Sequence, residues 1–241
     1  MSLYIAGLDL GQVSDYTALA IVEAQGTQWQ ETVPGHDPDF PGAAGKRAEI
    51  VRFEGPPVSF TIHYLGRERN VPYPQVVERV GARLRKAPGV DLLAVGATGV
   101  GRPVVDLFVQ AGLAPYGITI TSGTEAHGGA HDWHVPKVEL VSAVLVPFQA
   151  ERLVIPRALT LSGVLAAELS TFKVKITTAA NASFGAWREG EHDDLVLAVA
   201  MACWLGNRYL AERAGMVQAA AQHEATMEAL GVYDDPQISP Y

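Results

Sequence analysis

The sequence predicts an α/β protein built on one mixed sheet with helices on its faces. Near the amino end, apolar runs are separated by short polar turns, which is typical of antiparallel strands. Beyond residue 70, short apolar runs alternate with stretches in which apolar residues recur every three to four positions, the spacing of helices. A hairpin followed by β-α-β-α alternation favours a sheet that starts antiparallel and continues parallel.

The bulk composition fits a soluble α/β domain. The 241 residues suit one large domain, or one domain with an appendage, and 48% apolar residues suffice for a packed core. The chain contains no run of about 18 uncharged apolar residues, so we expect no membrane span. Its first residues lack a signal-peptide pattern. The single cysteine, Cys203, excludes an internal disulfide and suits a reducing compartment, so we expect a cytoplasmic protein.

The charge of the chain does not by itself indicate nucleic-acid binding. A net charge of −8 and a pI near 5.3 contrast with the basic face that phosphate-binding proteins normally show. Basic residues nevertheless cluster locally, at Arg67 and Arg69; Arg79, Arg83, Arg85 and Lys86; Arg152 and Arg157; and Lys173 and Lys175. We expect most of these to lie on solvated faces, and composition neither supports nor excludes DNA as a partner.

The first predicted strand ends on an acid, Asp9. Gly11 and a polar turn follow it, and a second apolar run over 18–22 predicts the antiparallel return strand. A carboxylate at the edge of a sheet core must be solvated, paired or bound to a metal ion. Asp9 is therefore the first candidate site residue.

The remaining elements follow from turn residues and apolar spacing. In the amino half we expect a Pro/Gly-rich loop over 33–45, strands over 47–53 and 59–65 that join the antiparallel set, a helix over 73–86, a buried strand over 91–95, a helix over 102–109 and a buried strand over 116–121. In the carboxyl half we expect helices over 137–149 (ended early by Pro147) and 159–171, a hairpin of 172–176 with 183–187, a buried helix over 193–206, a further helix over 207–230 and a loose tail. The predicted domains are residues 1–206 and a helical extension with tail, 207–241.

Two further acids, Asp193 and Asp194, stand at the start of the predicted buried helix. Together with Asp9 they can supply oxygen ligands for Mg²⁺ or Mn²⁺ if that helix docks beside the first strand. A helix amino terminus also favours carboxylates without any metal, so one of the pair can simply be a cap. Consecutive helical residues point about 100° apart, so we expect only one of the two to face the metal.

Five stretches resemble the nuclease domain of phage terminase large subunits. They are Gly-Leu-Asp-Leu-Gly with Asp-Tyr-Thr-Ala over 7–18, Val71-Pro-Tyr-Pro-Gln-Val-Val77, Ala97-Thr-Gly-Val-Gly101, His134-Val-Pro-Lys137 and His192-Asp-Asp-Leu-Val-Leu-Ala198. They occur in the order of that family and at about its spacing, and they cover residues 4–206. Each is weak alone, but together they are fairly specific.

The resemblance implies an RNase H-like fold and a metal-dependent endonuclease, a hydrolase that cuts double-stranded DNA during phage packaging. It makes Asp9 the metal ligand of the first strand and Asp193 or Asp194 the carboxy-terminal one, with two Mg²⁺ or Mn²⁺ ions that activate water for in-line attack. Arg102 and Lys137 are then candidates for contacting DNA phosphates. The implied partners are double-stranded DNA, a separate terminase ATPase, the small terminase subunit and the portal, in the cytoplasm of the host cell.

The chain departs from the family at Gly96. There the family carries an acid, directly before Ala-Thr-Gly-Val-Gly, and its loss is expected to leave the ions, the second above all, under-coordinated and the activity weak or absent. Asp91 cannot replace it, because five residues of extended strand span about 16 Å. Glu125 and Asp132, on a predicted loop, are the better substitutes.

The second departure is the absence of an ATPase motif. A packaging terminase carries an ATPase motor domain ahead of its nuclease. No Gly-x4-Gly-Lys-Ser/Thr phosphate loop occurs, and the similar stretch over 42–47 has a shorter spacing. The alternatives are an actin- or sugar-kinase-like ATP-binding protein, a junction resolvase or transposase, and a non-catalytic DNA-binding or assembly module. His127, His131 and His134 suggest a zinc cluster as a minor alternative.

Overall fold

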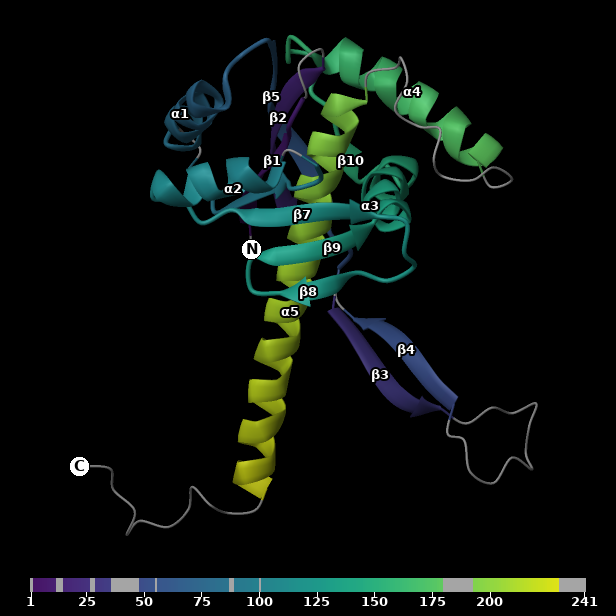
Figure 1. Ribbon diagram of the computed structural model, residues 1–241. Helices are drawn as coiled ribbons and strands as arrows, with labels where there is room; N and C mark the ends of the chain where they lie inside the picture. The colour runs from purple at the N-terminus through teal and green to yellow at the C-terminus, as the bar shows by residue number, and fades with distance from the viewer. Residues whose placement is uncertain are drawn as a thin grey trace. The chain divides into compact units, whose positions relative to one another are not determined.

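The computed structural model describes residues 2–11, 15–26, 29–35, 48–54, 56–86, 89–99, 101–179 and 193–229 (Figure 1). Its contacts divide the chain into two compact units. The first comprises Met1–Gln25 and Val58–Asn207, and the second comprises Gly26–Pro57 and Arg208–Tyr241. All predicted site residues belong to the first unit.

The first unit is built on an eight-stranded sheet with the order β10-β5-β2-β1-β6-β7-β9-β8 (Figure 1). Its strands are β1 (Ser2–Asp9), β2 (Tyr16–Gln25), β5 (Ser59–Arg69), β6 (Leu92–Gly96), β7 (Tyr116–Thr121), β8 (His127–Gly129), β9 (Asp132–Pro136) and β10 (Leu153–Val154). β1, β2 and β5 pair antiparallel, whereas β1, β6, β7 and β9 pair parallel. This arrangement confirms the predicted RNase H-like mixed sheet.

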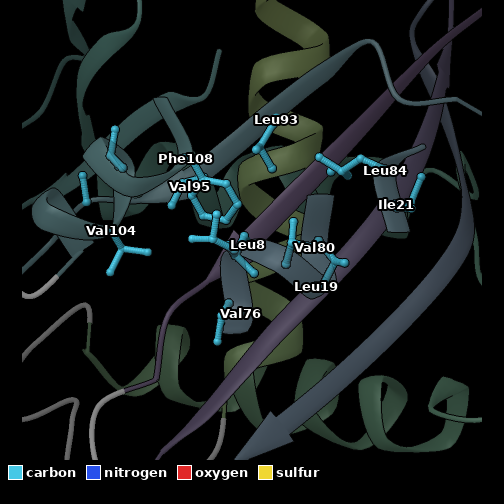
Figure 2. Close-up of a cluster of buried hydrophobic side chains, with 14 residues drawn as sticks. Leu8, Leu19, Ile21, Val76, Val80, Leu84, Leu93, Val95, Val104 and Phe108 are labelled. Atoms are coloured by element: carbon cyan, nitrogen blue, oxygen red, sulfur yellow. The ribbon is translucent and has the colours of Figure 1, made fainter. Parts of the chain in front are cut away.

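One face of the sheet carries the hydrophobic core shared with two helices, α1 (Tyr73–Leu84) and α2 (Gly101–Gln110). Figure 2 shows Leu8 and Val95 from the sheet near Phe108 of α2, and Val80 of α1 near Leu19. Each large apolar side chain buried in this way contributes about 1.5–3 kcal/mol. The apolar residues whose spacing predicted both helices are therefore the residues that these helices bury in the core.

The opposite face carries α5 (Asp194–Ala229), which packs very closely on β1. A Cβ atom on Gly7 would lie 1.9 Å from the carbonyl oxygen of Ala198, so only glycine permits this approach. Because side chains alternate along a strand, Gly7 faces α5 while Leu8 faces α1 and α2. Two more helices, α3 (Lys137–Gln149) and α4 (Ser162–Ala179), complete the unit. The predicted placement of helices on both faces is confirmed.

Several predicted boundaries are wrong. Residues 172–176 lie within α4 rather than in a strand, and their predicted partner over 183–187 lies outside the described residues. α3 runs through Pro147, whose missing N–H removes one helical hydrogen bond, and only Phe148 and Gln149 follow it in the helix. The predicted loop that holds Glu125 and Asp132 contains β8 and β9.

The described part of the second unit is a hairpin and the end of α5. β3 (Trp29–Gly35) pairs antiparallel with β4 (Ala48–Glu54) in a separate two-stranded sheet. The strand predicted over 47–53 is thus confirmed, but it does not join the other amino-terminal strands. Residues 33–35 belong to β3, and the rest of the predicted loop lies outside the described residues, as does the tail. No helix within the described ranges is long and apolar enough to cross a membrane.

Candidate acid site

A row of four residues crosses the sheet at the end of β1. Asp9 lies opposite Ala18 on β2, and Ala18 lies opposite Arg67 on β5. On the other side, Leu8 pairs with Val95, so the next step of the parallel register places Gly96 beside Asp9. Directly opposed residues share a face of a sheet, and Asp9 shares its face with Gly7 two positions earlier. The row Arg67, Ala18, Asp9 and Gly96 therefore faces α5.

Gly96 stands against the carboxylate of Asp9. A Cβ atom at this position would lie 3.4 Å from Oδ1 of Asp9 and 3.8 Å from Cε of Met201 on α5. These are ordinary van der Waals distances, so a Cβ atom here fits beside Asp9 without displacing the backbone. The position where the terminase motif has its acid is thus adjacent to Asp9.

The start of α5 lies toward the Asp9 end of β1. Ala198 touches β1 at Gly7, and Asp194 lies one helical turn before Ala198. The carbonyl oxygen of Asp193 accepts a hydrogen bond from the Leu197 N–H at 2.9 Å, which places Asp193 at the cap of the helix. Asp194 is buried, with only 7% of its surface exposed, and its Oδ2 accepts a hydrogen bond from Nη2 of Arg67 at 3.0 Å.

Glu168 of α4 is a member of this site that the sequence did not reveal. Its Oε2 accepts hydrogen bonds from the backbone N–H groups of Leu195 (3.1 Å) and Val196 (3.3 Å), which satisfies free donors in the first turn of α5. Its Oε1 lies 3.3 Å from Nη1 of Arg67. Burial raises the pKa of Glu168 to about 7, although the Arg67 charge and the Val196 N–H oppose this shift.

A signal for Glu168 exists in the sequence. Glu168 falls three residues after Leu165 and directly before Leu169, and all three are buried on α4. An acid on the apolar stripe of a helix requires a partner, since an unpaired buried charge is costly. The partner, Arg67, is 101 residues away in sequence, so local spacing does not identify it.

Arg67 is largely shielded from solvent, an exception to the expectation that most of the clustered basic residues lie on solvated faces. Its side chain is 12% exposed, and its guanidinium carbon lies 3.8 Å from the centre of the Tyr16 ring. We call Arg67, Tyr16, Glu168 and Asp194 the Arg67 cluster. Two carboxylates and an aromatic ring hold one guanidinium in this cluster.

Arg102 and Lys137 start helices at the same edge of the sheet as the acids. β1, β6, β7 and β9 are parallel, so their carboxyl ends share one edge. α2 begins against β6 so closely that a Cβ atom on Gly101 would lie 2.0 Å from the Gly96 carbonyl oxygen. Lys137 opens α3 directly after β9. Ligands of open α/β sheets bind at this edge.

Asp132 does not replace the acid missing at Gly96. Its Oδ1 accepts a hydrogen bond from Nη1 of Arg102 at 2.6 Å, and this bond lowers the pKa of Asp132. Asp132 lies opposite Gly117, and Gly117 lies opposite Val95, so about 10 Å of sheet separates Asp132 from β6. Glu125 lies in the exposed turn before β8.

The residues that the structure describes do not fit a two-ion site. Within the described ranges, no three His, Cys, Asp or Glu side chains are placed so that they could hold a metal ion. Gly96 offers no ligand, and Asp194 is held by Arg67. The zinc alternative fails by the same criterion among the described residues, where the rings of His127 and His134 stack at 5.0 Å.

The strand order, with its antiparallel and parallel pairings, is that of an RNase H-like α/β fold. Neither the protein-family models nor the curated proteins contain a match to the chain. Among solved structures, the chain is similar to the large terminase nuclease from the thermophilic phage G20c. The TM-score is 0.45 at 15% sequence identity, and the match covers 83% of this chain and 81% of the other. The fold assignment rests on the strand order rather than on this similarity.

Proposed function

We propose that this chain is a terminase-type nuclease domain that engages double-stranded DNA during phage packaging, with cleavage activity that is weak or absent. The observation that carries the proposal is the contact between Gly96 and Asp9. A side chain at Gly96 would begin 3.4 Å from Oδ1 of Asp9, where the terminase motif has an acid. The site thus keeps its first acid and lacks the neighbouring one.

The edge around Asp9 supports DNA as the ligand. Arg102 and Lys137 begin helices at the edge where β1 ends, together with Asp193 and Asp194. Basic side chains at this edge position a phosphate backbone, while acids supply the metal chemistry. DNA would be delivered by a separate terminase ATPase, with the small subunit and the portal, in the cytoplasm of the host cell.

Weak cleavage follows from the missing ligand. Two-ion hydrolysis of a phosphodiester depends on carboxylates that hold both Mg²⁺ or Mn²⁺ ions about 3.5–4 Å apart. In the described chain Gly96 has no side chain and Asp194 is paired with Arg67, so we assign no cleavage step to these residues.

Restoring the acid tests the proposal. Gly96→Asp is expected to raise Mn²⁺-dependent nicking of plasmid DNA about a hundredfold, because the charge stabilisation at stake is several kcal/mol. A Cβ atom added at Gly96 meets no atom closer than 3.4 Å, so the first atom of the new side chain requires no backbone shift. Gly96→Asn is the matched control: it has the same shape without the charge and should restore nothing.

A second substitution locates the site. Asp9→Asn in the Gly96→Asp background is expected to abolish the restored nicking, since Asp9 is the acid beside the new ligand. If the original chain and Gly96→Asp nick plasmid equally, the acid site is misplaced.

The Arg67 cluster favours a second candidate, a non-catalytic DNA-binding or assembly module on the nuclease fold. In this cluster Arg67 pairs with Asp194, so Asp194 can stabilise the fold without binding a metal ion. Binding of duplex DNA by Gly96→Asp, with no nicking at any Mn²⁺ concentration, would favour this candidate.

A further inference from the structure

We propose that Arg67 is the resident cation of the acid site. Its guanidinium joins Asp194 to Glu168 and so anchors the start of α5 without a divalent ion. The inference rests on the proposed function in one respect, the assignment of Asp194 to the acid site. Its test reads metal response and stability, so it is independent of whether the chain cuts DNA.

The geometry is that of a bridging cation. Nη2 of Arg67 lies 3.0 Å from Oδ2 of Asp194, and Nη1 lies 3.3 Å from Oε1 of Glu168. Exposed fractions of the three side chains are 12% for Arg67, 9% for Asp194 and 7% for Glu168. At such burial the carboxylates require a positive charge, because desolvation of an unpaired charge costs several kcal/mol. Among cations available to a protein, a guanidinium alone presents a planar fork that serves two carboxylates at once.

The cluster also fixes where the guanidinium sits. The Tyr16 ring lies 3.8 Å from the guanidinium carbon. Tyr16 is on β2, and Arg67 is on the neighbouring strand β5, where it lies opposite Ala18. Glu168 holds the first turn of α5 through the Leu195 and Val196 N–H groups. Arg67 therefore connects β5, α4 and α5 at one point.

Arg67 and Gly96 change the charge of the site in the same direction. The chain lacks a negative charge at Gly96 and has a permanent positive charge at Arg67, in one row across the sheet. Both features weaken the attraction for a divalent cation, and the guanidinium repels one that approaches Asp194. The charge of Asp194 is thereby balanced by Arg67 rather than by an added ion.

Removal of the guanidinium should make the protein respond to metal. In EDTA, Arg67→Gln is expected to unfold at a lower temperature than the parent chain, because two buried carboxylates lose their partner. Addition of Mn²⁺ should then raise the melting temperature of Arg67→Gln by about 5 °C, while the parent chain shifts by less than about 1 °C. Arg69→Gln is the matched control: Arg69 is an exposed arginine of the same strand, 5.0 Å from the Tyr16 ring, and its loss should create no Mn²⁺ response.

A measurement on the unmodified chain makes the test independent of whether the variant folds. Electron paramagnetic resonance of Mn²⁺ mixed with the full chain should show only the free-ion signal, at every metal concentration up to millimolar. Stoichiometric Mn²⁺ binding by the unmodified chain, or a folded Arg67→Gln with no Mn²⁺ response, would overturn the proposal. If Gly96→Asp fails to nick DNA while Arg67→Gln gains the Mn²⁺ response, the proposed function fails and this inference stands.

Discussion

Glu23 on β2 shows how one residue outside the acid site couples the first unit to pH. Hydrogen bonds from Ser2 and Gln25, together with the nearby His63, lower the pKa of Glu23 from 4.5 to about 2. A carboxyl group with a lowered folded-state pKa stabilises the fold above its unfolded pKa, and this contribution is lost as pH falls. The loss should therefore extend over the window from about pH 4.5 to pH 2.

Glu23→Gln should flatten this acid response. At neutral pH the variant is expected to lose about 1 kcal/mol of unfolding free energy. This is less than the full pKa shift implies, because solvent screens the interactions of Glu23. The difference between the variant and the parent chain should shrink below about pH 4.5 and vanish only near pH 2, where the parent has lost the same contribution. Urea unfolding at pH 7, 4.5 and 3 measures the difference, and a constant gap across these values would contradict the assignment.

At the scale of elements, the contact between α5 and β1 sets the position of Asp193 and Asp194. The contact depends on Gly7, where a Cβ atom would lie 1.9 Å from the Ala198 carbonyl oxygen and 3.0 Å from the Ala202 nitrogen. These are backbone atoms, which cannot move aside as a flexible side chain does. The helix must therefore shift away from the strand to admit any larger residue.

Gly7→Ala is consequently expected to destabilise the protein by about 1–3 kcal/mol, the usual range for overpacking a core. Gly163→Ala on α4 is the control, because nothing lies within 4 Å of its added methyl group and alanine favours a helix by about 1 kcal/mol over glycine. Urea unfolding of both variants gives the comparison. Equal stability of Gly7→Ala and the parent would show that α5 does not approach β1 as described.

At the scale of the whole molecule, the sequence predicted what depends on neighbours along the chain. Local spacing encodes the strand that ends at Asp9, the apolar stripe of α1 and the strand β7, and the structure contains all three. Residues 172–176 alternate apolar and basic residues like a strand, yet they continue α4, because an established helix adds each further residue at little cost.

The candidate site divides in the same way. Asp9, Gly96 and the Asp193–Asp194 pair stand in short motifs, so the sequence placed them at the ends of the correct elements. The Arg67 cluster was missed, since Arg67 and Asp194 are 127 positions apart and meet only through strand register and helix docking. Asp132 was assigned to a loop because β9 is short, and its pairing with β7 is non-local.

The charge of the whole chain shapes the expected DNA binding. A net charge of −8 opposes non-specific association, so binding should rely on a few basic side chains at the sheet edge, and its salt dependence should reflect that small number of phosphate contacts. Arg102 is 56% exposed, and its carboxylate partner Asp132 is 44% exposed. A DNA phosphate that takes Arg102 must therefore compete with Asp132.

This competition gives a prediction with two signs. Arg102→Gln should weaken duplex binding and reduce the slope of log K against log salt by about one, as expected for one lost phosphate contact. Asp132→Asn should instead strengthen binding several-fold, since the Arg102 guanidinium is then available to phosphate. Arg85→Gln is the control, because Arg85 is exposed and lies just after the end of α1. The chain then continues to Asp91, which bonds to Tyr4 at the end of β1 opposite to Asp9. Fluorescence anisotropy with a labelled duplex at several salt concentrations separates these outcomes. If Asp132→Asn weakens binding as Arg102→Gln does, the Arg102–Asp132 pair is structural and DNA contacts a different surface.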